Sequence, residues 1–216
     1  MKSTGSQQVL SKPFLPELLN FGKKIDISSF KKIVDTFFEF SEVIVIKLPK
    51  LISRYLDFYE DLIDEEIKIG NIKSNSKVVH IGSGPVPATS ILIAKKTGAK
   101  VICIDKNQKA IKQARFIVEK LGLSNKIEIK HAEASDFDIK AFNVILISHG
   151  ISPIEKFLSH ISKTMKDDTI AVFRTFSSDF EKLIRSDSKF DEMFKIGKIA
   201  TYEKHGSVIS VALYKK

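Results

Sequence analysis

A glycine-rich turn between an apolar run and a helical pattern constrains this 216-residue chain more than any other feature. Residues 78–81 read as a short buried strand, and Gly82, Ser83, Gly84 and Pro85 follow it directly. Residues 91–94 then sit in a helical pattern. Glycines at such a turn let the backbone approach a ligand, and the start of the helix offers free N–H groups. The alternative interpretation is a purely structural turn.

Short apolar runs alternate with helical patterns from residue 77 onward. The runs lie at 78–81, 101–104, 127–130, 144–147 and 170–173, and helical patterns include 91–94, 110–121, 151–165 and 180–184. Two final runs, 196–202 and 208–214, read as an antiparallel hairpin across Gly206. The alternation predicts an α/β fold, a Rossmann-like and mostly parallel seven-stranded sheet with helices on both faces.

The chain divides near residue 75. Residues 1–75 have mostly helical periodicity and form a predicted N-terminal helical cap, with a break at Pro49. Residues 76–216 form the predicted nucleotide-binding domain. No stretch approaches the ~20 apolar residues of a membrane span, and the start of the chain lacks the apolar core of a signal peptide. A single cysteine, Cys103, fits a reducing compartment, so we expect a cytoplasmic protein with no membrane partner.

The net charge of +9 comes entirely from the second part of the chain, because residues 1–75 carry 11 basic and 11 acidic side chains. A basic surface attracts anions such as nucleic acid or nucleotides. No lysine run exceeds two residues, and basic residues are not interleaved with aromatic ones as on single-strand-binding surfaces. We therefore interpret the lysines as solvated helix faces, and a nucleic-acid partner is not expected.

Two acids lie where a nucleotide would meet the predicted sheet. Asp105, followed by Lys106, ends the second run, where a carboxylate can accept hydrogen bonds from ribose hydroxyls. Glu133, followed by Ala134, comes just after the third run and can hold an adenine amino group. Pro87 replaces the third glycine of nicotinamide-binding turns, and the lysine of nucleoside-triphosphate loops is missing. S-adenosylmethionine, which lacks phosphates, demands less of this turn.

The spacing of these residues resembles that of class I S-adenosylmethionine-dependent methyltransferases. Residues 82–91, Gly-Ser-Gly-Pro-Val-Pro-Ala-Thr-Ser-Ile, are similar to the signature of nicotianamine synthases and related opine-metallophore synthases, with Val86 and Ala88 in place of leucines. Residues 173–178 and 206–211 add shorter similarities, and the resemblance covers roughly residues 55–216.

The resemblance implies a transferase that moves the 3-amino-3-carboxypropyl arm of S-adenosylmethionine to an amine or amino acid and releases methylthioadenosine, as in nicotianamine biosynthesis. It also implies a catalytic glutamate in a Y-x-x-L-x-x-x-E pattern, which Tyr59 and Glu66 fit here. Such a carboxylate can take the proton of the attacking amine. Thr89, in the signature, becomes a substrate-binding candidate.

The helix that contains Glu66 is dense in acids. Asp57, Glu60, Asp61, Asp64, Glu65 and Glu66 follow one another without an intervening base. This face could bind an amine, bind a metal or simply be solvated. Glu66 falls with Tyr59 and Leu62 on the more apolar stripe, which favours it as the functional carboxylate.

Two further candidates lie at the expected ligand edge of the sheet. Arg174 follows the fifth run and could clamp a substrate carboxylate or form a salt bridge to the acidic helix. His149 ends the fourth run and could line a substrate pocket. The other histidines show no metal-ligand spacing, so no metal is expected.

Two other functions remain open from the sequence. The chain could be a methyltransferase acting on a small molecule or RNA, although residues 148–151 lack the Asn/Asp-Pro-Pro-Tyr motif of base N-methyltransferases. It could also be a binding module without catalytic activity. Among assemblies, a homodimer is the one that stays open as a prediction.

Overall fold

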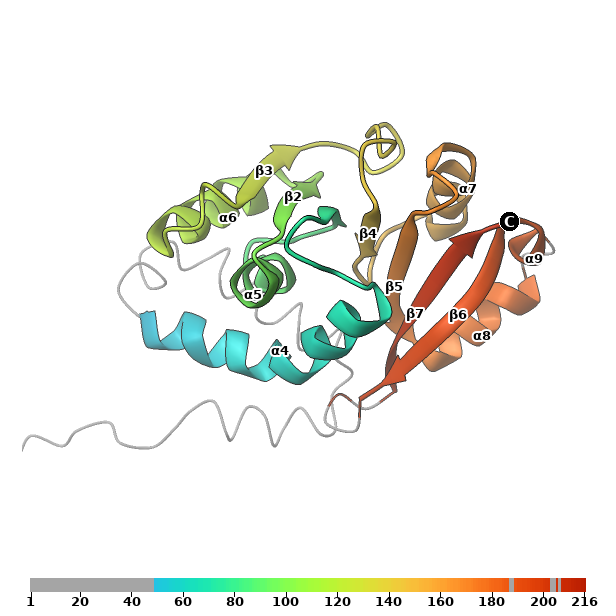
Figure 1. Cartoon of the computed structure of the whole chain (residues 1–216), viewed down its shortest axis with the longest axis horizontal. Helices are drawn as coiled ribbons and strands as arrows, with labels where there is room; N and C mark the ends of the chain where they lie inside the picture. The colour runs from blue at the N-terminus through green and yellow to red at the C-terminus, as the bar shows by residue number, and fades with distance from the viewer. Residues whose placement is uncertain (1–48, 187–188, 203–204, 206) are drawn as a thin grey trace, which may run out of the picture.

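The computed structural model describes residues 49–186, 189–202, 205 and 207–216 (Figure 1). The strands are β1 (Lys77–Ile81), β2 (Lys100–Asp105), β3 (Ile127–His131), β4 (Val144–Ile147), β5 (Ile170–Phe176), β6 (Phe194–Thr201) and β7 (Val208–Lys215). The helices are α4 (Pro49–Ile69), α5 (Ala88–Thr97), α6 (Gln108–Lys120), α7 (Ile154–Thr164), α8 (Ser177–Ser186) and α9 (Phe190–Met193).

All seven strands form one sheet in the order β3-β2-β1-β4-β5-β7-β6. The first five strands are parallel, and β7 lies antiparallel between β5 and β6. This arrangement confirms the predicted mostly parallel seven-stranded sheet and its final hairpin. The order reverses between β1 and β4, and ligands bind at such switch points in open α/β sheets.

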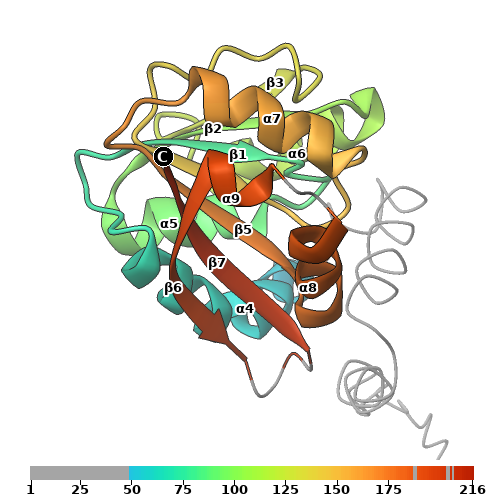
Figure 2. The ribbon, with the colours of Figure 1, turned by 90° about the vertical axis from the view of Figure 1, so that its right-hand side faces the viewer.

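The sheet is covered on both faces, as Figures 1 and 2 show. Residues of α4, α5 and α6 share one hydrophobic cluster with the sheet, and residues of α7, α8 and α9 share the other. Strands buried on two faces need apolar side chains on both, which explains runs such as Val144–Ile147, where every residue is buried.

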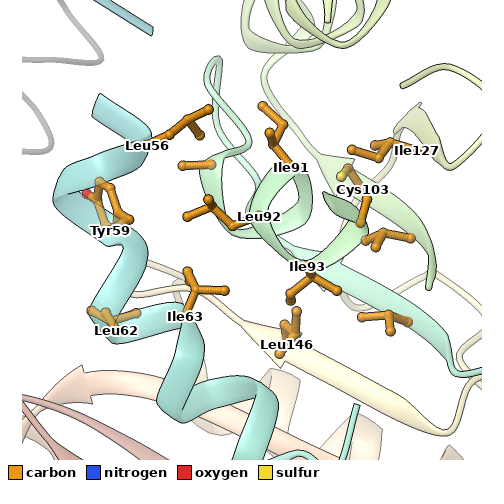
Figure 3. Packing of buried hydrophobic residues seen from close by; sticks show 14 of the residues in the cluster. Leu56, Tyr59, Leu62, Ile63, Ile91, Leu92, Ile93, Cys103, Ile127 and Leu146 are labelled. Carbon is orange, nitrogen blue, oxygen red and sulfur yellow. The ribbon is translucent and has the colours of Figure 1, made fainter. Parts of the chain in front are cut away.

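Helix α4 is held by one apolar stripe. Its buried residues recur every three or four positions: Ile52, Tyr55, Leu56, Tyr59, Leu62, Ile63, Glu66 and Ile69. Figure 3 shows this stripe facing Ile91 and Leu92 of α5, with Cys103 and Leu146 of the sheet behind them. The described helix of the predicted cap therefore shares the core of the sheet domain. The helices predicted before residue 49 lie outside the described residues, and the domain boundary near residue 75 stays a prediction.

Strand β5 is longer than the sequence indicated. The run 170–173 continues to Phe176, so Arg174 lies inside the strand rather than after it. The added residues pair with β7, where Arg174 lies opposite Ser210 and Phe176 opposite Val208. The apolar pattern of β5 alone could not reveal this extension, because residues 174–176 are held in the strand by their pairing with β7.

Within the described ranges, no helix combines the length and apolar character needed to cross a membrane.

The packing of α4 yields a stability prediction. Ile63 is completely buried between α4 and the rest of the core, so Ile63→Ala should lower the free energy of unfolding by about 2–5 kcal/mol. Ser53→Ala, at an exposed position of the same helix, should change it by less than about 0.5 kcal/mol. Urea denaturation measures both. Equal effects would mean that α4 does not pack as described.

Candidate functional site

The glycine turn is fixed by backbone hydrogen bonds to the neighbouring strand β2. The N–H groups of Gly82 and Ser83 both donate to the carbonyl of Ile104, at 2.9 and 3.2 Å. Gly82 and Gly84 have φ values of +71° and +67°, which other residues rarely adopt. A side chain at Gly82 would also meet Ile151 at 3.4 Å. The turn therefore needs glycine for its conformation, whereas the contact of an added Cβ with Ile151 would be an ordinary one.

Asp105 completes this turn from the end of β2. Its Oδ2 accepts the N–H of Gly84 at 2.8 Å, and its Oδ1 accepts the N–H of Asn107 at 2.8 Å. An ionised carboxylate offers about four acceptor positions. Two are used here, so each oxygen keeps one position for hydroxyl groups of a ligand.

A cavity of about 480 Å³ opens at the carboxyl ends of the parallel strands. Eight of the predicted site residues line it: Gly82, Gly84, Pro85, Asp105, Lys106, Glu133, Ala134 and His149. Its size lies within the usual range for small-molecule sites. The sequence analysis missed other lining residues, which include Asn107, Asp136, Ile151 and Lys156. Asn107, Asp136 and Ile151 come from the segments after β2, β3 and β4, and Lys156 lies in the first turn of α7. Their place just after the carboxyl ends of predicted strands was the available signal in the sequence.

A second cavity of about 260 Å³ adjoins the first. Both cavities are lined by His149, Gly150 and Ile151, which form the wall between them. Asp179 and Lys182 of α8 line the far side of the second cavity. His149 packs edge-to-face on Phe176, with ring centroids 4.6 Å apart. The predicted placement of His149 at a pocket therefore agrees with the structure.

Glu66 and Arg174 form a buried ion pair away from both cavities. Glu66 is 1% exposed, and the Arg174 side chain is 13% exposed. The Nε and Nη2 atoms of Arg174 donate to Oε1 and Oε2 of Glu66 at 2.8 and 2.6 Å. Such two-point pairs fix both position and orientation. The sequence left two roles for Arg174, a clamp on a substrate carboxylate or a salt bridge to the acidic helix. The structure shows the salt bridge.

Three more side chains complete this cluster. The hydroxyl of Ser210, on β7, donates to Oε1 of Glu66 at 2.6 Å. Arg174 also donates to Oγ1 of Thr89, in the first turn of α5, at 3.0 Å. The Tyr59 ring lies 5.9 Å from the guanidinium carbon of Arg174, a cation–π distance. The cluster therefore connects α4, α5, β5 and β7.

Burial and the negative charge of Glu66 change the pKa values of Arg174 and Tyr202. Burial disfavours the charged form of Arg174, but the charge and hydrogen bonds of Glu66 outweigh it and raise the pKa of this guanidinium. Burial, followed by the negative charge of Glu66, raises the pKa of Tyr202. This phenol therefore stays neutral beside the pair.

Three other acids of α4 are paired at the surface. Glu60 and Asp64 both contact Lys96 of α5, at 2.7 and 2.8 Å, and Glu65 contacts Lys68 at 2.6 Å. The hydrogen bonds that Lys96 donates to Asp64 and Glu60 raise the pKa of Lys96. Glu66 differs from these acids because it is buried and its partner is the largely buried Arg174. Its place on the apolar stripe predicted this burial.

The structure separates the predicted site residues into two groups. The nucleotide candidates and His149 line the large cavity, whereas Tyr59, Glu66, Thr89 and Arg174 form the buried cluster. Ser83 is buried in the turn and does not line the cavity. Helix α5 connects the groups, because it begins directly after the turn and carries Thr89. Sequence reasoning missed Ser210, although a serine within an apolar strand signals a buried polar contact.

Comparison with known proteins gives a family match over most of the described chain. The family model described as nicotianamine synthase protein matches residues 49–193. The match covers α4, the parallel strands and helices α5 to α9, and it includes Glu66, the glycine turn and Arg174.

The curated relatives include proteins named L-histidine 2-aminobutanoyltransferase from Yersinia pestis and Pseudomonas aeruginosa. The one from Yersinia pestis is 34% identical over 74 residues, which are 34% of this chain and 28% of that protein. The one from Pseudomonas aeruginosa is 24% identical over 131 residues, which are 60% of this chain and 50% of that protein. The matches thus span half or less of these relatives.

Solved structures with the same fold include two of MtNAS. A mutant in complex with S-adenosylmethionine has a TM-score of 0.64 at 21% identity, over 74% of this chain and 62% of that one. The complex with MTA and tNA has a TM-score of 0.67 at 19% identity, over 84% of this chain and 68% of that one. At these identities the likeness establishes the fold.

The buried pair yields a second stability prediction. Arg174→Met would leave Glu66 buried without its counter-charge and should cost about 3–5 kcal/mol of unfolding free energy. Adding Glu66→Gln removes that unpaired charge and should restore part of the loss. Urea denaturation of the single and double variants measures the coupling. Lys68→Met, which breaks an exposed pair on the same helix, should leave stability unchanged, and additive effects at 66 and 174 would contradict the description.

Proposed function

This chain belongs to the nicotianamine synthase family, and we propose that it transfers the 3-amino-3-carboxypropyl group of S-adenosylmethionine to an amine, with release of methylthioadenosine. The observation that carries this proposal is the buried Glu66 carboxylate, which Arg174 and Ser210 hold next to the helix that begins at the glycine turn. The matches cover half or less of the length of the curated relatives, so the activity stated for this chain is our proposal.

The large cavity is the proposed donor site. The free acceptor positions of Asp105 suit the two ribose hydroxyls, and Glu133 suits the adenine amino group. The open backbone at Gly82 and Gly84 leaves room for the methionine part, which carries no phosphate. This assignment places the sulfonium near the turn and therefore near the start of α5.

The transfer itself needs alignment and a proton acceptor. The amine nitrogen attacks the γ-carbon of the sulfonium, a C–N bond forms, and the electrons of the broken C–S bond go to sulfur. Sulfur leaves as the neutral thioether of methylthioadenosine, and the amine gives up one proton. Glu66 is the proposed acceptor of that proton. Holding the reacting atoms in line supplies much of the remaining rate enhancement.

The other candidates take supporting roles in this proposal. Arg174 is bound to Glu66 and Thr89, so we assign it to holding the proton acceptor rather than a substrate carboxylate. Tyr59 packs against Arg174 and keeps its guanidinium in place. His149 lies on the wall between the two cavities and would bound the donor site on that side.

A small amine or amino acid is the proposed acceptor, which suits the word histidine in the names of the two relatives. Such substrates and S-adenosylmethionine are cytoplasmic metabolites, and the buried free thiol of Cys103 fits a reducing compartment. We therefore place the proposed reaction in the cytoplasm.

The nucleoside product tests the proposed reaction. The protein is incubated with S-adenosylmethionine and a panel of amino acids and polyamines, and the nucleoside is identified by mass spectrometry. We expect methylthioadenosine that increases with the acceptor concentration. S-adenosylhomocysteine would instead indicate methyl transfer, and binding of S-adenosylmethionine without any product would indicate a binding module.

The role of Glu66 is tested by Glu66→Gln. Loss of the proton acceptor should lower kcat at least about 100-fold, while binding of S-adenosylmethionine, measured by calorimetry, stays within a few-fold. Glu65→Gln makes the same change on the neighbouring exposed residue and should keep the activity. Circular dichroism checks that both variants fold. A Glu66→Gln variant with the full rate of transfer would exclude Glu66 as the proton acceptor.

A further inference from the structure

We propose that Ser210 is a positioning residue that determines which oxygen of Glu66 accepts the substrate proton. The inference rests on the proposed function, because it takes Glu66 as the proton acceptor. It starts from the hydrogen bonds that the carboxylate already accepts.

The two oxygens of Glu66 are not equivalent. Oε1 accepts two hydrogen bonds, from Nε of Arg174 at 2.8 Å and from Oγ of Ser210 at 2.6 Å. Oε2 accepts one, from Nη2 of Arg174 at 2.6 Å. A carboxylate has about four acceptor positions, two on each oxygen. Oε1 is therefore full, and the one remaining position among the described contacts lies on Oε2.

Ser210 is required for this asymmetry. Arg174 alone donates once to each oxygen, which would leave one free position on Oε1 and one on Oε2. The Ser210 hydroxyl fills the position on Oε1. A proton taken from the amine can then go only to Oε2, so the direction of attack on the donor is set by the same contact.

The fold fixes Ser210 and Arg174 with respect to each other. They are directly opposite in the antiparallel pair of β5 and β7, and their side chains project from the same face of the sheet. Side chains of such pairs are about 5 Å apart at Cβ. Glu66 is therefore held from two paired strands, whose ladder hydrogen bonds keep both groups in register.

The burial of Ser210 supports a specific use of its hydroxyl. Ser210 is completely buried between Ile209 and Val211 in an otherwise apolar stretch of β7. A hydroxyl buried without a partner destabilises a protein, whereas alanine would fit this strand without needing one. The O–H···O distance of 2.6 Å is in the range of charge-assisted hydrogen bonds to a carboxylate.

The test compares variants at position 210 in the methylthioadenosine assay. Ser210→Ala should lower kcat about tenfold with little change in KM for S-adenosylmethionine, as expected for the loss of one hydrogen bond to a charged group. Ser162→Ala, a buried serine of α7 that bonds only within its helix, should change neither quantity.

A matched pair keeps the test decisive if Ser210→Ala does not fold. Ser210→Thr and Ser210→Val have nearly the same volume, but only threonine keeps the hydroxyl. We expect threonine to keep the kcat of the unmodified protein and valine to lower it about tenfold, with little change in KM for S-adenosylmethionine in either variant. An unmodified protein that releases no methylthioadenosine would reject the proposed function itself. Product formation with the same kcat in all position-210 variants would reject only the role of Ser210.

Discussion

The ion pair between Glu66 and Arg174 is the interaction on which the arrangement of this protein depends. It joins residues 108 positions apart and connects α4 to the middle of the sheet. Removing two charges from water is costly, and the cost is offset only when geometry and additional hydrogen bonds are good. Here the two-point contact, Ser210 and Thr89 provide them. The pair and its supporting hydrogen bonds therefore bring together α4, α5, β5 and β7.

Helix α5 joins this pair to the donor cavity. Its first residue, Ala88, follows the glycine turn closely, and Thr89 in its first turn accepts a hydrogen bond from Arg174. A ligand lying against the turn would thus be close to the element that helps to hold Glu66. The proposed donor site and the buried carboxylate are therefore joined through one helix.

Features that depend on local pattern could be predicted from the sequence. The apolar runs predicted the parallel strands, the turn predicted that Gly84 and Asp105 lie together, and helical periodicity predicted Glu66 on the buried stripe of α4. Features that depend on partners distant in sequence could not. Pairing with β7 extends β5 past Arg174, and the contact of Ser210 with Glu66 requires the complete sheet. The position of Ser210 within an apolar run was the available signal in the sequence, but it does not identify Glu66 as the hydrogen-bond partner.

A crystal structure with methylthioadenosine and an acceptor amine would test the central claim most directly. The account predicts the thioether sulfur beside the glycine turn and the acceptor nitrogen within hydrogen-bond reach of Oε2 of Glu66, about 3 Å. Arg174 and Ser210 should still occupy Oε1. An acceptor nitrogen that instead contacts Asp179 in the second cavity, with Glu66 closed off behind Arg174, would contradict the account.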